Sequence, residues 1–225
     1  MIKLVLDAMG GDNAPQAPCE GAVLALREDK DLSIVLAGVP DAIEPYLKDA
    51  GDVRERISVL NAPEVISNSE SAAMAVRQKR DSAVVRGMLM VREKEADGFV
   101  SAGSTGAVLV GGMLRLGRVP GIERPALAPL MPGAKGQFLL IDCGANVDSK
   151  PEYLAQFGLM GDAFMRQVMK LEKPRVGLAN IGAEEEKGNQ LYIAAHQLLK
   201  KEDINFIGNV EAREIPSNLA DVIVC

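Results

Sequence analysis

The sequence predicts an α/β layered fold with a mostly parallel sheet, and three observations lead to this prediction. Short aliphatic runs alternate with segments of helical periodicity along the whole chain, at spacings typical of right-handed crossover units. Aromatic residues make up only 4% of the 225 residues, so aliphatic side chains must build the core, as in buried parallel strands. Glycine-containing turns follow several expected strand ends, where folds of this class bind ligands.

Strands are expected where aliphatic runs stop at a glycine, a proline or a polar turn. The first run leads from the start of the chain into a glycine turn, and Pro63 ends the third. The expected strands are 1–8, 32–39, 57–63, 97–103, 137–148 with a turn at its end, 175–182, 204–212 and 221–225.

Helices are expected where apolar residues recur at helical spacing. Asp41 follows Pro40 and is a candidate cap of the second helix. The periodicity over 69–96 indicates two helices that break near Asp81 and Ser82. The remaining expected helices are 18–28, 105–117, 151–172 and 184–202, and 124–137 is expected to be a loop or an irregular strand.

We expect one α/β domain over residues 1–225, because no internal repeat, low-complexity tract or linker interrupts the pattern. A natural domain seldom ends on an uncovered apolar strand, so we expect this domain to lack its C-terminal part. No apolar run approaches the 18 residues of a membrane span, and the first residues lack the features of a signal peptide. These observations predict a cytoplasmic protein.

The composition argues against several kinds of site. The single histidine, His196, is expected on a surface or half-buried helix face, so a Ser/His/Asp or Cys/His relay is not expected. The three cysteines lack the spacing of a zinc site or a disulfide framework. Neither G-x-G-x-x-G nor G-x-x-x-x-G-K-[ST] occurs. We expect no metal and no cofactor.

The formal net charge is −6, but the charges are unevenly distributed. Residues 74–136 include ten basic and five acidic residues, a net charge of +5, which leaves −11 on the rest of the chain. Such a segment is either a set of solvated helix faces or a docking surface for an acidic partner. Nucleic acid is not the expected partner, because the whole protein is acidic and poor in aromatic residues.

Residues 97–112 read DGFVSAGSTGAVLVGG and predict a strand, a tight glycine turn and the start of a helix. Such a turn directs backbone N–H groups and hydroxyls at one spot, with the positive end of the helix behind them. Anions bind there without a charged side chain. The motif therefore suggests a phosphate ligand.

Three further turns combine glycine with Asn or Asp side chains: 7–12, 141–148 and 180–189. Taken alone, each is more readily explained by turn geometry than by ligand binding. Four such turns at the carboxyl ends of parallel strands are expected to gather around one cleft.

The motifs DAMGGDNAP, SAG-x-TGA, GANVD, KPE-x-L-x-QF-x-x-MG, NIG-x-E-x-x-KGN and GNVEAR-x-I occur in this order along the chain. As a set they resemble the bacterial phosphate acyltransferase of phospholipid synthesis, the PlsX family. That family extends considerably beyond residue 225, in agreement with the missing C-terminal part. Ser104 stands where the family usually carries Asn, and it lacks the two donors of an amide. Cys143 stands where the family tolerates apolar residues, so we interpret it as a core residue.

The resemblance implies a three-layer α/β/α sandwich like that of the isocitrate and isopropylmalate dehydrogenases. It also implies an enzyme that transfers a fatty acyl group from acyl carrier protein to inorganic phosphate. The acyl phosphate product would pass to a glycerol-3-phosphate acyltransferase in phosphatidic acid synthesis. The family is homodimeric and associates peripherally with the membrane.

This reaction needs no Ser/His relay, because a thioester is already electrophilic and phosphate is already an anion at neutral pH. The enzyme must hold phosphate near the carbonyl and stabilise the tetrahedral oxyanion. We expect catalytic roles for Lys187, Thr105 and Asn180, with Lys187 supplying a positive charge to phosphate. The expected substrate-binding residues are Asp7, Gly10, Gly11, Asp12, Ser101, Gly103, Ser104, Gly106, Asn146 and Asn189.

Simpler roles stay open for some of these side chains. Lys187 is also explained as part of a solvated helix start beside three glutamates, and Asp7 and Asp12 as caps of the first helix. Because acyl carrier proteins are strongly acidic, the basic segment is a candidate docking surface. The expected docking residues are Arg77, Lys79, Arg80, Arg115, Arg118 and Arg124.

Three other functions are considered beside this one. A short-chain phosphotransacetylase would use acyl-CoA in place of acyl carrier protein. A non-catalytic module would bind phosphate or an acyl carrier without turnover. A dehydrogenase of similar fold is disfavoured, because the sequence has no dinucleotide fingerprint.

Overall fold

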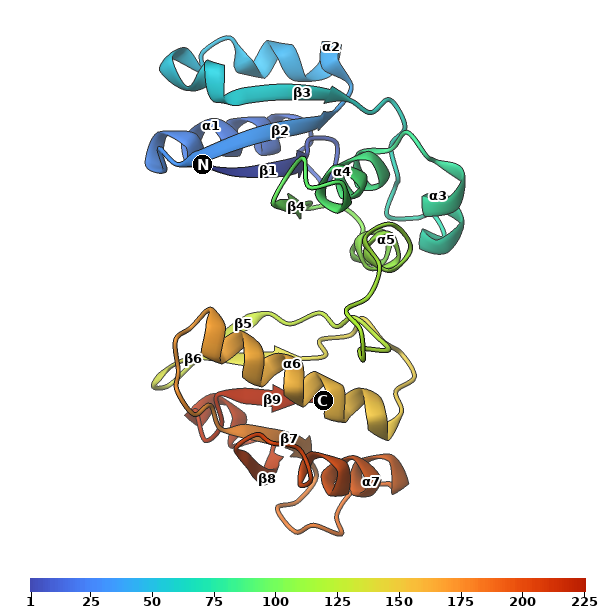
Figure 1. Cartoon of the computed structure of the whole chain (residues 1–225), viewed down its shortest axis with the longest axis vertical. Helices are drawn as coiled ribbons and strands as arrows, with labels where there is room; N and C mark the ends of the chain where they lie inside the picture. Colours follow the sequence, from blue (N-terminus) through green and yellow to red (C-terminus); the bar gives the residue numbers. More distant parts are fainter. The chain divides into compact units, whose positions relative to one another are not determined.

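The computed structural model describes all residues, 1–225, and the chain forms two compact units (Figure 1). Unit 1 is Met1–Arg118 and unit 2 is Val119–Cys225. Each unit has its own sheet and its own buried clusters. That residues 1–225 form one α/β domain stays a prediction.

Unit 1 contains a four-stranded, fully parallel sheet in the order β3-β2-β1-β4. Each strand connects to the next through helical segments, which parallel neighbours require. The strands are β1 (Ile2–Asp7), β2 (Leu32–Gly38), β3 (Ile57–Asn61) and β4 (Gly98–Val100). The helical segments are α1 (Gln16–Glu28), α2 (Pro40–Ile43), η1 (Glu44–Leu47), η2 (Gly51–Arg56), α3 (Ala72–Gln78), α4 (Ala83–Arg92), α5 (Thr105–Gly111) and the π-helical turn η3 (Gly112–Leu116).

Helices cover both faces of the unit 1 sheet. On one face, Leu36 of β2 packs in a buried cluster with Leu26 of α1. On the other face, Val35 of β2 packs in a cluster with Ala83 of α4. Successive strand residues point to opposite faces, so β2 is buried on both sides and the unit has three layers.

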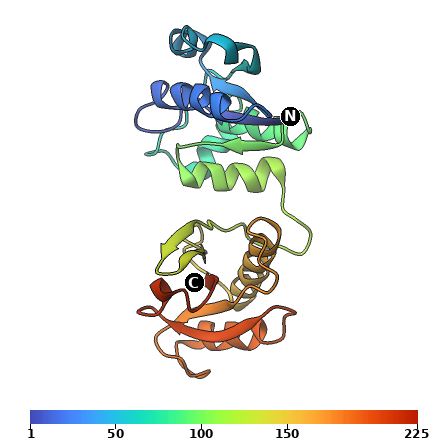
Figure 2. The same ribbon diagram turned by 90° about the vertical axis from the view of Figure 1, so that its left-hand side faces the viewer.

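Unit 2 contains a five-stranded sheet in the order β5-β6-β9-β7-β8. Strand β5 pairs antiparallel with β6, and the other pairs are parallel. Strand β8 is an edge strand, visible in red-orange in Figure 2. The strands are β5 (Leu130–Gly133), β6 (Gly136–Ile141), β7 (Val176–Asn180), β8 (Phe206–Glu211) and β9 (Val222–Val224).

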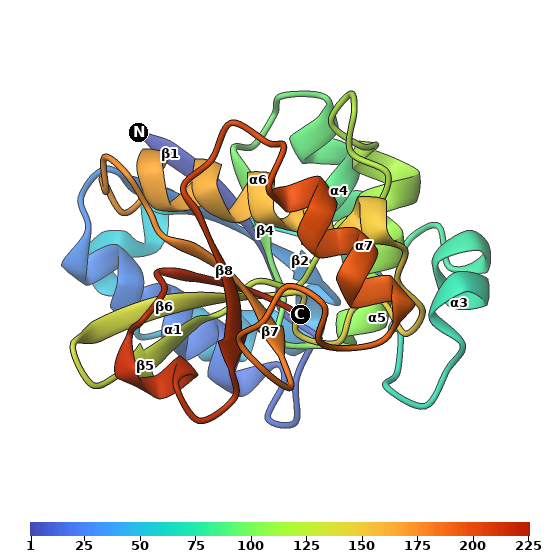
Figure 3. The ribbon, with the colours of Figure 1, turned by 90° about the horizontal axis from the view of Figure 1, so that it is seen from below.

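Helices α6 (Pro151–Gln167) and α7 (Gln190–Leu199) lie next to each other on one face of this sheet (Figure 3). Phe157 of α6 and Leu199 of α7 are fully buried with Leu139 of β6 in the largest cluster of the unit. The opposite face has a smaller cluster that includes Ile223 and is packed by Ile215 of the short helix η4 (Ile215–Ser217).

The structure confirms the α/β class with mostly parallel sheets, divided here between two sheets. It also confirms the helix break: Ser82 precedes α4 and its Oγ accepts a hydrogen bond from the N–H of Val85, at 3.4 Å. Three expected caps are wrong. Helix α2 follows Val39 with Pro40 at its first position, so Asp41 lies inside the first turn. Helix α1 follows Pro15 without a side-chain cap, so neither Asp7 nor Asp12 caps it.

Candidate functional site

The first two glycine turns meet in unit 1, because they follow the adjacent parallel strands β1 and β4. Ser101 Oγ donates to Asp7 Oδ2 at 2.8 Å, and the N–H of Gly103 donates to Ser101 Oγ at 3.0 Å. A Cβ atom at Gly10 would lie 2.6 Å from Asp7 Oδ2 and 2.9 Å from the nitrogen of Gly103. Only glycine fits at position 10 without moving the second turn.

Asp7 is buried, with 5% of its surface exposed. Burial raises the pKa of its carboxyl group above the ordinary value. The hydrogen bond from Ser101 and the backbone N–H groups of Met9 and Gly10 oppose this shift. Gly11 adopts φ +103°, which favours glycine. Asp7, Gly10, Gly11 and Ser101 thus fix the shape of the paired turns.

The segment Ser104–Gly106 leaves three successive backbone N–H groups without a protein acceptor. Ser104 Oγ accepts from the N–H of Ala107 at 3.3 Å and so caps α5. Thr105 and Gly106 are exposed, and the Thr105 hydroxyl has no protein partner. The N–H of Gly103 is already bonded to Ser101, so the free donors begin one residue later than the sequence predicts.

A groove of about 480 Å³ borders the same turns. Gly10, Gly11, Ser101 and Asp12 lie along it, together with apolar side chains of β1, β4 and the start of α1. Asp12 is exposed, and its carboxylate has no protein partner. The groove therefore offers space beside the first turn and beside Ser101 and Ala102, which precede the unpaired donors in the chain.

In unit 2, the third and fourth turns follow β6 and β7, two parallel strands that flank β9. Asp142 is 7% exposed; its Oδ1 accepts from the N–H of Leu127 at 2.7 Å. Its Oδ2 accepts from the backbone N–H of Asn146 at 2.7 Å and from Asn146 Nδ2 at 3.0 Å. Asn146 Nδ2 also donates to the carbonyl of Pro125 at 2.9 Å. Both amide hydrogens of Asn146 are thus used to hold the turn.

The fourth turn is closed by Asn180. Its Nδ2 donates to the carbonyl of Lys187 at 3.0 Å, and its Oδ1 accepts from the N–H of Ile181 at 2.9 Å. Asn189 Oδ1 accepts from the N–H of Tyr192 at 3.2 Å and caps α7. The side chain of Lys187 is exposed and has no protein partner. Of the residues in this turn, Lys187 alone presents an uncommitted cation.

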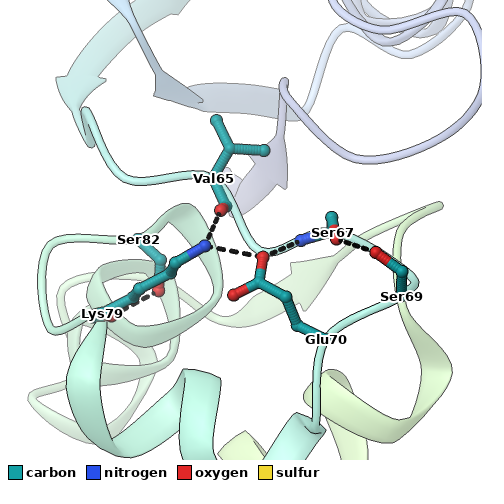
Figure 4. Close-up of polar contacts among 6 residues, drawn as sticks. All are labelled: Val65, Ser67, Ser69, Glu70, Lys79 and Ser82. Carbon is teal, nitrogen blue, oxygen red and sulfur yellow. Dashed lines mark hydrogen bonds and ion pairs between the residues drawn. The ribbon is translucent and has the colours of Figure 1, made fainter.

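The predicted docking residues fall into two groups. Lys79 Nζ binds the carbonyl of Val65 and the carboxylate of Glu70, both at 2.6 Å, as Figure 4 shows. The hydrogen bond from Lys79 lowers the pKa of Glu70. Arg115 donates to the carbonyl of Val76 at 2.9 Å, and its Nε is buried. These two cations are committed to the fold of unit 1.

The other docking candidates are exposed. The guanidinium groups of Arg77 and Arg80 have no protein partner, and both residues lie at the end of α3. Arg118 is exposed at the end of unit 1. Arg124 belongs to unit 2 and lies 5.8 Å from the centroid of the Tyr153 ring. Arg77 and Arg80 are therefore the available pair.

Two side chains differ from their sequence interpretation. Cys143 is exposed, because it lies past the end of β6, where the turn leaves the core. His196 is 3% exposed and lies 3.0 Å, Nδ1 to Oδ1, from Asn209. Helical periodicity could not reveal this burial, since the polar partner lies on another element. The sequence marks Asn209 only through the motif GNVEAR and does not pair it with His196.

The structure brings the predicted residues together in two groups, one in each unit. Unit 1 holds the turns after β1 and β4, and unit 2 holds those after β6 and β7. The meeting of all four turns in one cleft stays a prediction. No group of three or more His, Cys, Asp or Glu side chains is arranged to hold a metal ion. No helix is both long and apolar enough to cross a membrane.

The fold is that of phosphotransacetylases and related α/β proteins. The structure matches a phosphotransacetylase from Streptococcus pyogenes with a TM-score of 0.68 and 17% identity, over 99% of this chain and 76% of that one. It also matches a 4-hydroxythreonine-4-phosphate dehydrogenase from Burkholderia phymatum with a TM-score of 0.54 and 15% identity, over 100% and 79% of the two chains. These similarities confirm the predicted relation to the dehydrogenase-like sandwich.

The chain belongs to the family described as "Fatty acid synthesis protein", which it matches over residues 2–225. It is 50% identical over 225 residues to a phosphate acyltransferase of Clostridium perfringens. That alignment covers 100% of this chain and 66% of the relative. The resemblance inferred from the motifs is thereby confirmed at the level of the family.

Proposed function

We propose that this protein transfers a fatty acyl group from the thioester of acyl carrier protein to inorganic phosphate. The observation that carries the proposal is the run of three unpaired N–H groups at Ser104–Gly106, beside the free hydroxyl of Thr105. Such donors suit a phosphate or a developing oxyanion. The name of the clostridial relative supports the same chemistry.

In the proposed reaction, a phosphate oxygen attacks the thioester carbon and a C–O bond forms. The carbonyl oxygen becomes an oxyanion, which backbone donors stabilise. The C–S bond then breaks, and the carrier leaves as a thiolate that takes a proton from solvent. Phosphate is anionic at neutral pH, so binding and orientation supply most of the catalysis. This agrees with a chain whose single histidine is buried.

Within this proposal, Lys187 pairs with phosphate and Thr105 donates its hydroxyl hydrogen to phosphate or to the oxyanion. Asn180 has both polar atoms in contact with its own turn, so we assign it to holding Lys187 in place. For Lys187 and Thr105 to act on the same phosphate, this proposal requires that the turns of the two units share one cleft. They rest on the exposed, unpaired state of the Thr105 and Lys187 groups.

The proposal is tested with Thr105→Val and Lys187→Ala in the full-length gene product. Loss of a charged partner raises the KM for phosphate about tenfold or more in Lys187→Ala, and loss of a neutral hydrogen bond raises it a few fold in Thr105→Val. Lys201→Ala, at an exposed lysine just past α7, is the matched control. Unchanged KM and kcat in both variants would remove these residues from the mechanism.

The acyl donor is acyl carrier protein in this proposal, and an acidic partner fits the unpaired Arg77 and Arg80. The alternative donor is a short-chain acyl-CoA, and the similarity to a phosphotransacetylase shows a shared fold without favouring this donor. Comparing kcat/KM for an acyl carrier protein thioester and an acyl-CoA decides between them. Higher kcat/KM for the acyl-CoA overturns the carrier assignment.

The family resemblance extends the proposal to the setting of the reaction. We infer a cytoplasmic homodimer that contacts the membrane surface and supplies acyl phosphate to a glycerol-3-phosphate acyltransferase for phospholipid synthesis. Sedimentation of the full-length protein tests the dimer, and flotation with vesicles of anionic lipid tests the membrane contact. A monomer in sedimentation would contradict the dimer, and protein that stays in the buffer fraction instead of floating with the vesicles would contradict the membrane contact.

A further inference from the structure

The only histidine in the chain lies in a buried polar pair. His196 on α7 is 3% exposed and Asn209 on β8 is 7% exposed, with His196 Nδ1 and Asn209 Oδ1 3.0 Å apart. The edge of the imidazole also packs against Phe206, with ring centroids 5.0 Å apart. Polar groups are buried at a cost unless they are paired, so the partners of this pair define its role.

The hydrogen bonds fix the direction of this pair. Asn209 Nδ2 donates to the carbonyl of Glu184 at 2.7 Å. A carbonyl only accepts, so the amide oxygen of Asn209 must face His196. His196 therefore carries its hydrogen on Nδ1 and donates it to Asn209. The pair ends on the backbone of the loop 181–188, which lies within the fourth glycine turn, 180–189.

The same loop presents Lys187. The carbonyl of Glu184 also accepts the N–H of Lys187, at 3.1 Å, and the carbonyl of Lys187 accepts from Asn180 Nδ2, at 3.0 Å. The backbone of Lys187 is thus held on both sides, while its ammonium group has no protein partner. Asn209 is the buried end of this arrangement.

Besides the Asn180 and Asn209 contacts, the other side-chain ties of the loop run through Glu185, whose Oε1 lies 3.9 Å from His196 Nε2. Within the loop 181–188, residues 183–187 are exposed and only Gly182 is buried. The charged neighbour Glu185 is bound by Lys200 Nζ at 2.8 Å, away from Lys187. Without the tie to Asn209, a mobile lysine beside three glutamates would pair with them instead of with a ligand.

We propose that Asn209 is a positioning residue that fixes the backbone of Lys187, with His196 holding the Asn209 amide in the required orientation. The proposal rests on the role of Lys187 given above. It gives the buried pair of His196 and Asn209 a role in phosphate binding, although neither side chain needs to touch the substrate. Because the loop itself buries little surface, loss of the pair acts first on the order of the loop.

The experiment compares Asn209→Ala, His196→Phe and His196→Gln in the full-length gene product. Gln keeps a donor for Asn209 Oδ1, whereas Phe does not. Leu199→Ala, a fully buried position on the same helix without a bond to the loop, is the control for stability alone. Two measurements are made: the KM for phosphate, and backbone amide hydrogen exchange over 181–188.

We expect Asn209→Ala to raise the KM for phosphate about tenfold with a smaller change in kcat, and to speed exchange in the loop. His196→Phe follows the same direction, His196→Gln restores most of the parent values, and Leu199→Ala lowers Tm without either effect. Asn209→Ala should add nothing to Lys187→Ala, because both act through one group.

The outcomes separate this proposal from the one on which it rests. Unchanged loop exchange and KM in Asn209→Ala, with a lower Tm as in Leu199→Ala, overturn the positioning role. Faster loop exchange in Asn209→Ala supports the role of Asn209 in holding the loop. If the KM for phosphate is unchanged in Lys187→Ala at the same time, the role of Lys187 is overturned while that of Asn209 stands. If Asn209→Ala does not fold, the contrast between His196→Phe and His196→Gln gives the same decision.

Discussion

Ser101 Oγ lies 2.8 Å from Asp7 Oδ2, although 94 residues separate the two in the sequence. This bond joins the turn after β1 to the turn after β4, and the Ser101 oxygen in turn accepts the N–H of Gly103. The free donors of Ser104–Gly106 follow directly. The shape of the candidate anion site therefore depends on the buried carboxyl group of Asp7, which also lines the groove beside these turns.

The first prediction concerns Asp7 and pH. Its pKa is raised by burial, so the folded protein binds this proton more readily than the unfolded chain does. The Asp7 contribution to stability is therefore fully present below the unfolded pKa and is lost as the pH rises through the raised, folded pKa. Asp7→Asn removes this loss, so its stability relative to the parent should improve with rising pH. Urea unfolding between pH 4 and 7 measures this, and parallel pH profiles would contradict it.

The second prediction uses two glycines of unit 1. A Cβ atom at Gly10 would collide with Asp7 and Gly103, so Gly10→Ala should lower the free energy of unfolding by about 2–3 kcal/mol and weaken phosphate binding. Gly21 in α1 has no atom within 4 Å of an added Cβ, so Gly21→Ala should raise stability by about 1 kcal/mol. Equal effects in chemical denaturation of the two variants would show that the turn is not tightly packed.

The third prediction concerns carrier docking. Reversing the two unpaired cations, Arg77→Glu with Arg80→Glu, should weaken binding of acyl carrier protein about tenfold at low salt and flatten its salt dependence. Lys30→Glu with Lys48→Glu changes the charge of unit 1 equally at other exposed positions and is the control. Titration calorimetry at several salt concentrations gives both quantities. If the two pairs behave alike, net charge and not a docking surface governs association.

The fourth prediction separates Lys79 from that surface. Lys79 ties Val65 and Glu70 to the end of α3. Helix α3 packs on α5, and a Cβ atom at Gly106 of α5 would lie 3.2 Å from the Cβ of Ala72 in α3. Lys79→Ala should lower Tm and leave the salt dependence of carrier binding as in the parent. Glu70→Gln should lower Tm in the same way, and the double variant should add little. A flattened salt dependence in Lys79→Ala would return this residue to the docking set.

The fifth prediction tests the ion pair of unit 2. Asp221 accepts three hydrogen bonds from Arg175, one of them from its backbone N–H, at 2.8–3.0 Å. Burial alone would raise the pKa of Asp221, but these bonds outweigh it and the pKa is lowered. Asp221→Asn should therefore cost about 1–2 kcal/mol at pH 7. The cost should fade as the pH drops through the lowered pKa, and a cost independent of pH would exclude the ion pair as its source.

The sequence by itself determined the order of the main strands and helices, because the spacing of apolar residues in a segment reports which of its own faces is buried. The break at Ser82 and the turns after β1, β4, β6 and β7 were found in the same way. The motifs in those turns also identified the family. What local patterns report is the conformation of one segment and which of its faces is buried.

Only the tertiary structure decided which polar groups are already paired. Asp7 meets Ser101, and His196 meets Asn209, because strand order and helix packing bring separate elements together. The same contacts commit Lys79 to the fold while Thr105 keeps a free hydroxyl. Lysines with different partners look alike in a sequence, since the partner is set by strand order and register and not by the neighbouring residues.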